Sequence, residues 1–279
     1  MENSFGYFIL SYGKPYTNTT LDLLKKFNVK YPIYLVVGKD DPKYEEYLKL
    51  DIENVKVIVF DKNDFLDTVN ALGQYNKTHK ICTYARQFVD DYARENGIRY
   101  CCILFDDILD FRLRYFEEGK IKGNGNFDFN KVIDEYINML NISDRVIMVG
   151  PPGSSFYIGI SKEKADEDIP THYGNMFIYD INKPIGPFTA SILEDMDIVL
   201  QNSNRGYIGI FPFGLQVVCR KPMATADAYQ GIGKWEYIQQ YKLLTRGKIT
   251  NPDKLKIPYK KFLPKILNEK YRKKETTNE

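Results

Sequence analysis

The sequence predicts an α/β protein with a mostly parallel central sheet flanked by helices. Four apolar runs in the first 110 residues have the length and composition of buried strands: 5–10, 32–37, 55–60 and 100–105. Amphipathic segments separate these runs, and the one at 83–96 is followed by Gly97, a residue that commonly ends a helix. Strands that alternate with helices form parallel sheets, because each helix carries the chain back to the start of the next strand.

The same periodicity predicts the remaining elements. Helices are expected at 17–26, 41–48, 83–96, 128–140, 196–203 and 235–244. Further strands are expected at 145–150 and 175–180, with β-rich segments at 207–213 and 214–220. A mobile or ligand-dependent loop is expected at 61–80. A bent or peripheral strand or a short helix is expected at 111–116, and a flexible excursion of the chain at 119–126.

No repeat or linker divides the chain, so a single domain over residues 1–279 is the simplest organisation. It has a first half at about 1–110, a second half at about 111–245 and a C-terminal helical, basic extension at about 246–279. Within 254–274 there are nine Lys and Arg residues and one acid, Glu269. Such a run is either a solvated tail or a surface that attracts phosphates.

Composition excludes several classes of protein. The net charge of +2 is too small for a chain whose whole surface binds a polyanion, and no apolar run reaches the length of a membrane span. None of the four cysteines has zinc-finger spacing, and Cys101 and Cys102 lie inside an apolar run. The cysteines are interpreted as buried thiols in a protein of a reducing compartment. Together with the lack of a long apolar run, this predicts a cytoplasmic protein with no membrane partner.

Acidic residues follow the apolar run at 100–105. Asp106 and Asp107 come directly after it, and Asp110 follows three residues later. The carboxyl edge of a parallel sheet is where ligands bind in α/β proteins, and Mg²⁺ or Mn²⁺ is usually held there by one or two carboxylates and phosphate oxygens. The alternative is a helix whose first turn is acidic, and the spacing alone does not decide between them.

Two loops should lie beside these acids, because they also follow parallel strands. One is 11–15, with sequence Ser-Tyr-Gly-Lys-Pro, and the other is 38–41, with sequence Gly-Lys-Asp-Asp. Their backbone N–H groups suit a nucleobase and ribose, and Asp40 can accept a ribose hydroxyl. Neither loop has the glycine pattern of a dinucleotide site or a P-loop, and each taken singly is more often only a turn.

Two further candidates lie farther along the chain. Arg86 falls in the first turn of the helix at 83–96, where an arginine suits a phosphate or diphosphate, unless it is simply a surface residue. Glu194 and Asp195 form a second acidic pair. A carboxylate placed away from a metal can act as general base on an acceptor hydroxyl, although acidic capping of the next helix explains the pair equally well.

Taken together, these motifs resemble the GT-A glycosyltransferases, and most of all the phage and TET-associated glycosyltransferases. The matching stretches occur in the family's order, at 11–15, 38–41, 59–62, 83–87, 105–111 and 193–197. The resemblance is good over about 5–110 and patchy over 117–173, and the basic segment at 258–274 also resembles the ending of that group.

The resemblance implies a GT-A-like fold and a nucleotide-sugar donor, with a UDP-sugar favoured, bound through Mn²⁺ or Mg²⁺. It makes Asp107 the metal ligand and Asp106 a ribose or sugar contact. Residues 1–110 become the donor-binding half and 111–245 the acceptor side. The other donor-binding positions implied by the matching loops are Ser11, Tyr12, Gly13, Lys14, Asp40 and Arg86.

For catalysis, the resemblance assigns the acidic pair to the general base, with Asp195 the better candidate and Glu194 the second. It also implies that the acceptor is a hydroxymethylated pyrimidine in DNA, in the cytoplasm of the host cell if the gene is carried by a phage. The basic run at 254–274 and the 22 Tyr and 17 Phe residues agree with a DNA partner.

One departure from the family keeps other functions open. Phe105 stands where the first of three consecutive acids is expected. A nucleotide-binding module without catalytic activity is therefore an alternative. A polysaccharide or protein acceptor would leave the donor motifs unchanged. A two-acid metal site on a similar sheet also serves nucleotidyltransferases, which release pyrophosphate instead of a nucleoside diphosphate.

Overall fold

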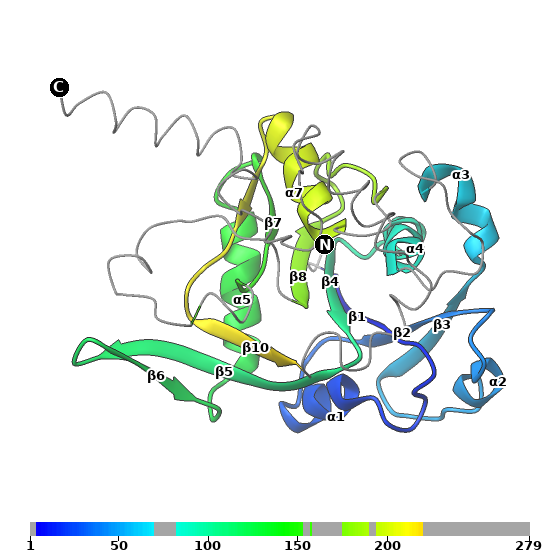
Figure 1. Cartoon of the computed structure of the whole chain (residues 1–279), viewed down its shortest axis with the longest axis horizontal. Helices are drawn as coiled ribbons and strands as arrows, with labels where there is room; N and C mark the ends of the chain where they lie inside the picture. Colours follow the sequence, from blue (N-terminus) through cyan, green and yellow to red (C-terminus); the bar gives the residue numbers. More distant parts are fainter. Residues whose placement is uncertain (1–3, 70–81, 153–156, 158–174, 190–193, 220–279) are drawn as a thin grey trace, which may run out of the picture.

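The computed structural model describes residues 4–69, 82–152, 157, 175–189 and 194–219. They form a mixed α/β fold with a seven-stranded sheet, helices on both of its faces, and a smaller three-stranded sheet beside it (Figure 1). The predicted fold class is thereby confirmed for this part of the chain. The helix expected at 235–244 and the basic extension lie outside the described residues. No helix within the described ranges is both long enough and apolar enough to cross a membrane.

The large sheet has the strand order β3-β2-β1-β4-β8-β7-β9. Its first four strands are parallel: β1 (Phe5–Leu10), β2 (Ile33–Gly38), β3 (Val55–Phe60) and β4 (Tyr100–Phe105). Beyond β4, the strand β8 (Met176–Asp180) runs antiparallel to both of its neighbours, and β7 (Val146–Val149) pairs in parallel with β9 (Ile208–Ile210). The predicted succession of β-α units with acids after the fourth strand is confirmed.

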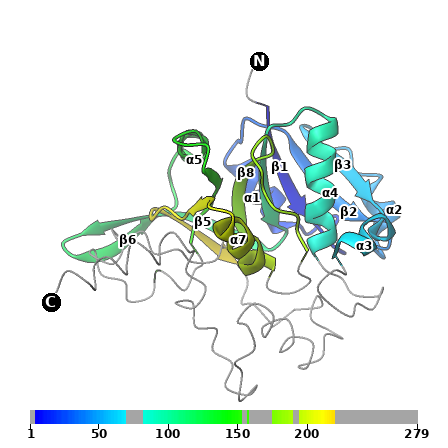
Figure 2. The ribbon, with the colours of Figure 1, turned by 90° about the horizontal axis from the view of Figure 1, so that it is seen from above.

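Helices cover both faces of this sheet (Figure 2). One core contains α1 (Thr19–Lys26) and α5 (Phe129–Leu140), and the other contains α4 (Cys82–Glu95) and α7 (Glu194–Asn204). Because side chains alternate along a strand, β4 contributes to both cores. Cys101 enters one and Cys102 the other, and both are free thiols.

The smaller sheet continues the chain directly from β4. Its order is β10-β5-β6, formed by β10 (Leu215–Cys219), β5 (Ile108–Glu117) and β6 (Lys120–Asn124). The expected flexible excursion at 119–126 is therefore wrong, and the segment at 111–116 is a strand. Glu118 and Gly119 both have positive φ, 50° and 73°, as a two-residue hairpin turn of type I′ requires. Because such turns usually contain Asn or Asp before the Gly, the Glu-Gly pair does not indicate a hairpin in the sequence.

The expected loop at 61–80 is also wrong in its first part. A 3₁₀ turn, η1 (Lys62–Phe65), and a helical turn, α3 (Leu66–Val69), follow β3, and residues 70–80 lie outside the described part. Asp61 begins this structure, because its side chain accepts a hydrogen bond of 2.9 Å from the backbone N–H of Asn63. The short helix expected at 41–48 is the single turn α2 (Tyr44–Tyr47).

Candidate active site

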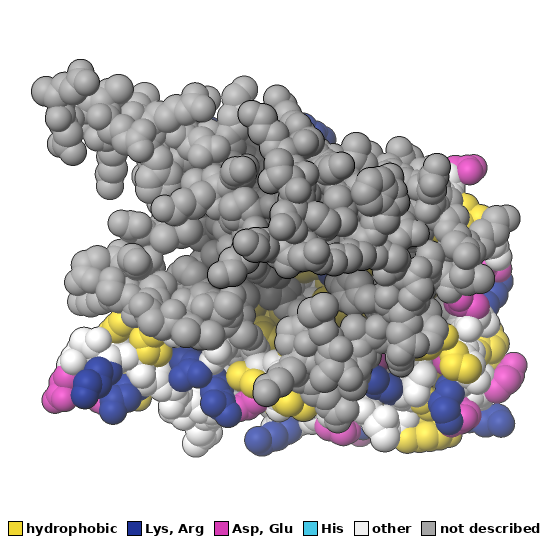
Figure 3. Space-filling view, viewed as in Figure 1, with side chains coloured by type: hydrophobic (Ala, Val, Ile, Leu, Met, Phe, Trp, Pro, Cys, Tyr) yellow, Lys and Arg dark blue, Asp and Glu magenta, His cyan; other side chains and the backbone are white. Residues whose placement is uncertain are grey.

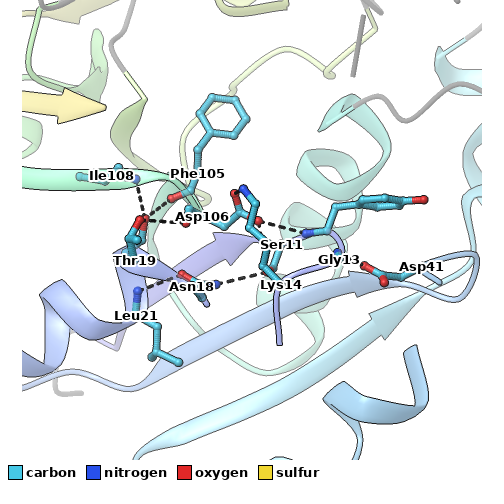
Figure 4. Close-up of polar contacts among 12 residues, drawn as sticks. Ser11, Gly13, Lys14, Asn18, Thr19, Leu21, Asp41, Phe105, Asp106 and Ile108 are labelled. Carbon is cyan, nitrogen blue, oxygen red and sulfur yellow. Dashed lines mark hydrogen bonds and ion pairs between the residues drawn. The ribbon is translucent and has the colours of Figure 1, made fainter. Parts of the chain in front are cut away.

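The carboxyl ends of β1, β2 and β4 lie side by side. Leu10 pairs with Val36 on one side and with Phe105 on the other, so the loop after β1 meets the acids after β4. Asp106 accepts hydrogen bonds from Ser11 Oγ at 3.4 Å and from the backbone N–H of Tyr12 at 3.2 Å (Figure 4). The prediction that the loop at 11–15 lies beside Asp106 is confirmed.

Asp106 is buried and holds this loop in place. Besides Ser11 and Tyr12, which both bind Oδ2, Lys14 Nζ donates to Oδ1 at 2.7 Å. An ionised carboxylate offers about four acceptor positions, two on each oxygen. The described residues use three of them, which leaves one position on Oδ1 that they do not occupy.

Two residues that the sequence did not single out complete the loop. Asp41 is 4% exposed and accepts from the backbone N–H groups of Gly13 at 2.8 Å and Lys43 at 2.7 Å. The hydroxyl of Tyr47 accepts from the N–H of Lys14 at 2.8 Å and lies 2.7 Å from Ser11 Oγ. Burial raises the pKa of Tyr47 to about 12, so its hydroxyl stays protonated near neutral pH. The hydrogen bond from Lys43 N to Asp41 is typical of an aspartate that forms a turn. The only sequence feature that could have indicated Asp41 is its place in the turn after β2.

Asn18 and Thr20 connect the same loop to the acids. Asn18 begins α1 by accepting from the N–H of Leu21 at 2.9 Å, and its amide donates to Ser11 Oγ at 3.2 Å. Thr20 Oγ1 donates to the carbonyl of Phe105 at 2.5 Å and accepts from the N–H of Ile108 at 3.0 Å. The start of α1 therefore holds both ends of the turn that carries Asp106 and Asp107.

Replacing Gly13 by Ala tests whether the loop conformation is strained for other residues. Gly13 has φ +70°, and nothing lies within 4 Å of the position that a Cβ would occupy. We expect a loss of about 1–2 kcal/mol in the free energy of unfolding, measured by urea denaturation, because a left-handed conformation disfavours Ala. Gly125→Ala is the control, since Gly125 is equally open and has no positive φ. Equal stabilities of the two variants would contradict the prediction.

Asp107 is the second acid of the turn and is half-buried. Burial, and less strongly the Asp107 carboxylate, raise the pKa of the Cys219 thiol to about 12. Within the described ranges, no group of three or more His, Cys, Asp or Glu side chains is arranged to hold a metal ion. Mg²⁺ and Mn²⁺ bound to phosphorylated ligands need only one or two carboxylates, with phosphate oxygens and water as the other ligands. The metal-ligand role expected of Asp107 stays a prediction.

Arg86 lies on α4 and is almost completely buried, with 2% of its side chain exposed. Its Nη1 is 3.0 Å from Oε1 of Glu194, which also accepts from the Cys82 thiol at 3.1 Å. The ring centroids of Phe105, Phe177 and Phe188 lie 5.4, 5.4 and 5.9 Å from the guanidinium carbon. Phe105, which replaces the expected first acid, is thus a cation–π partner of Arg86. The predicted contact between Arg86 and the donor stays a prediction.

The first turn of α7 carries three acids with different surroundings. Glu194 pairs with Arg86, as described above. Asp197 is buried and accepts from Gln201 Nε2 at 2.7 Å and from Thr189 Oγ1 at 3.1 Å. Asp195, between them, is half-buried. The structure thus places Glu194 and Asp197 in contacts that stabilise the fold.

Asp40 lies at the end of β2, on the other side of the loop at 11–15. Its carboxylate forms an ion pair with Lys62 of η1, and the neighbouring Lys39 lies 3.6 Å from Asp61. Each pair has one clearly exposed member, Asp40 at 41% and Lys39 at 59%, so solvent screens both pairs and they add little to stability. Their effect is to join the ends of β2 and β3, and the ribose contact expected of Asp40 stays a prediction.

A double-mutant cycle on Arg86 and Glu194 tests whether this pair connects α4 to α7. We expect Arg86→Met and Glu194→Gln each to cost about 3 kcal/mol in the free energy of unfolding, because each leaves the other charge buried. The double variant should cost less than the sum by about 1–3 kcal/mol. Lys30 and Asp134, exposed and 2.7 Å apart, are the control pair, with an expected coupling of at most about 1 kcal/mol. Equal coupling in the two cycles would contradict the prediction.

Comparison with known families relates this geometry to a group of enzymes. The family model of the TET-associated glycosyltransferases matches residues 6–211, which span the sheet from β1 to β9 and include every acid discussed above. The chain belongs to the TET-associated glycosyltransferases. The resemblance predicted from the motifs is confirmed. No protein with curated annotation matches the chain.

Two solved glycosyltransferase structures were compared with this TET-associated family member. The mannosyltransferase PcManGT from Pyrobaculum calidifontis, solved with GDP-Man and Mn²⁺, is 12% identical with a TM-score of 0.52, over 96% of this chain and 69% of that one. Glucosyl-3-phosphoglycerate synthase from Mycobacterium tuberculosis, solved with Mn²⁺, UDP and phosphoglyceric acid, is 8% identical with a TM-score of 0.47, over 90% of this chain and 80% of that one. The similarity to PcManGT supports a GT-A fold.

Proposed function

We propose that this protein transfers a sugar from a nucleoside diphosphate donor to a hydroxyl acceptor. The donor we favour is a UDP-sugar. The observation that carries the proposal is the meeting of the loop at 11–15 with Asp106 and Asp107 at the carboxyl edge of the sheet. Family membership supports the reaction class. PcManGT was solved with a nucleotide-sugar and Mn²⁺, which supports a divalent ion, Mn²⁺ or Mg²⁺, as the cofactor here.

The donor would lie over the loop at 11–15. Ser11, Tyr12 and Gly13 would face the base and ribose, with Asp40 as a further ribose contact. The acceptor position left on Asp106 Oδ1 suits one ribose hydroxyl. Lys14 Nζ lies beside this position and provides a positive charge for the diphosphate.

Asp107 would be the protein ligand of the divalent ion. When bound, that ion offsets the negative charge of the nucleoside diphosphate leaving group. In the transfer, the acceptor oxygen forms a bond to the anomeric carbon, and the bond from that carbon to the diphosphate oxygen breaks. Asp195 takes the proton of the acceptor hydroxyl. We assign this role to Asp195 from the family's acidic motif, which matches 193–197, and keep Glu194, which contacts Arg86 and Cys82, as the second candidate. Arg86 would contact the donor, as the resemblance implies.

A thermal-shift screen of nucleotides tests donor binding. UDP with Mn²⁺ is expected to raise the melting temperature more than UDP alone, since ligands that bind only the folded state stabilise it. GDP, CDP and dTDP, each with and without Mn²⁺, show whether the base is recognised. Absence of a shift with every nucleoside diphosphate would overturn the proposal.

The acceptor we propose is a hydroxymethylated pyrimidine in DNA, in the cytoplasm of a host cell if the gene is carried by a phage. The family assignment and the basic run at 254–274 support it. If the proposal is right, DNA binding should weaken steeply as salt rises, because phosphate contacts release counterions. Removing the chain from Lys254 onward should flatten that slope. Binding to DNA that is absent or insensitive to salt would contradict a DNA acceptor and leave the sugar transfer standing.

A further inference from the structure

The small sheet carries an arginine whose surroundings differ from those of the other basic residues nearby. Arg114 lies on β5, and its Nε donates to Oε1 of Gln216 at 2.8 Å, with Nη2 donating to the same oxygen. Gln216 is a buried side chain of β10, 9% exposed, so its amide is held in place. Because the amide is neutral, it fixes the guanidinium and leaves the full positive charge.

The neighbouring basic side chains form ion pairs with carboxylates. Arg112, on the same face of β5, pairs with Asp110 at 2.8 Å, and Lys122 on β6 is 3.8 Å from Glu117. No carboxylate among the described residues forms an ion pair with Arg114. Lys and Arg side chains gather at the end of the molecule formed by β5 and β6 (Figure 3). The charge of Arg114 is therefore positioned but not cancelled.

The backbone of β6 leaves room for this guanidinium. A Cβ at Gly123 would lie 2.5 Å from Nη1 and 3.1 Å from Cζ of Arg114, so the absence of a side chain there allows Arg114 to lie across the strand. Aromatic rings pack against one another in the same part of the small sheet. Phe213 stacks on Phe116 at 5.2 Å and contacts Tyr157 at 5.5 Å, and the Tyr157 hydroxyl donates to the carbonyl of Leu215 at 2.6 Å.

We propose that Arg114 forms a phosphate-binding subsite for a nucleic-acid acceptor strand. A fixed guanidinium matches the oxygens of a phosphodiester. The subsite rests on the proposed function, in which DNA is the acceptor. It lies on β5, the strand that continues from the turn with Asp107.

The position along β5 indicates an extended ligand. Arg114 lies seven positions after Asp107, which corresponds to about 23 Å along a strand. A small phosphorylated acceptor at the reacting sugar cannot span that length. A polynucleotide has a phosphate at every residue and can reach both places.

Fluorescence anisotropy with a labelled DNA duplex, at several salt concentrations, tests the subsite. Arg114→Gln is expected to weaken binding on the order of tenfold and to lower the slope of log Kd against log salt by about 1. Gly123→Ala keeps every charge but displaces the guanidinium, so it should weaken binding by a similar factor. Lys120→Gln removes an exposed charge of the same hairpin and should change Kd by less than about twofold.

Three results would overturn the proposal. One is full-length protein that does not bind the duplex. Another is an equal loss for Arg114→Gln and Lys120→Gln with none for Gly123→Ala, which would mean attraction by net charge only. The third is competition by polygalacturonate, a polyanion without phosphate, that is as strong as competition by unlabelled DNA, which would mean a general anion site.

Hydrolysis of UDP-sugar in the absence of DNA separates this proposal from the proposed function. Arg114→Gln and Gly123→Ala should hydrolyse the donor at the wild-type rate, since neither residue contacts the donor loop. If no variant hydrolyses any donor and DNA binding still depends on Arg114, the sugar transfer fails and the subsite stands.

Discussion

Replacing Asp195 by Asn is expected to lower kcat for sugar transfer by about 10²–10⁴-fold, because the acceptor hydroxyl loses its general base. Donor affinity should stay close to that of the wild type, since the donor loop at 11–15 is held by Asp41, Tyr47 and Asp106, not by α7. Coupled detection of the released nucleoside diphosphate gives kcat. Titration with UDP and Mn²⁺ gives the affinity.

Glu194→Gln is the matched comparison for this variant. It removes the charge next to Asp195 and breaks the pair with Arg86, so we expect lower stability together with a smaller loss in kcat. The dependence of kcat on pH distinguishes the two roles. Protonation of the general base lowers kcat at acidic pH, and this decrease should be absent in Asp195→Asn and present in Glu194→Gln. A larger loss of kcat in Glu194→Gln, at a temperature where both variants are folded, would transfer the role of base to Glu194.

Asp107→Asn should lower kcat/KM on the order of a thousandfold, since a divalent ion contributes several kcal/mol to the stabilisation of the leaving group. The increase in melting temperature that Mn²⁺ adds to UDP should disappear, and the increase given by UDP alone should remain. This second measurement does not depend on turnover. It reports on the ligand role of Asp107 even if the acceptor has not been found.

Asp110→Asn provides the control for Asp107. Asp110 lies three residues away, at the start of β5, and is paired with Arg112 at 2.8 Å. It should therefore keep the Mn²⁺-dependent shift. Loss of that shift in Asp110→Asn and its persistence in Asp107→Asn would move the metal ligand to Asp110.

The sequence predicted the central sheet well because its signals are local. β1, β2, β3 and β4 are short apolar runs bounded by turns, and parallel pairing then brings their carboxyl ends to one edge. This is why Ser11 and Asp106, 95 residues apart, could be expected to lie together. The acidic start of α7 was visible for the same reason.

Other features depend on contacts that no local pattern records. Tyr47 contacts Ser11 and Lys14 only because α2 packs against β2, and no motif in the sequence marks Tyr47. Arg86 suggested a phosphate contact, but its pairing with Glu194 could not be foreseen across 108 positions of sequence. The β5–β6 hairpin was missed because Glu118 occupies a conformation that usually favours Gly or Asn.

Sugar transfer from a nucleoside diphosphate donor can be measured by mass spectrometry of the products. The full-length protein is incubated with UDP-sugars, GDP-mannose, Mn²⁺ and DNA that contains hydroxymethylated pyrimidines. We expect release of a nucleoside diphosphate and a gain in DNA mass equal to one sugar residue. Attachment of a nucleoside monophosphate to the acceptor, with release of sugar 1-phosphate, would show nucleotidyl transfer instead. Nucleotide binding with no product from any donor, on DNA or on polysaccharide and protein acceptors, would contradict the proposed sugar transfer.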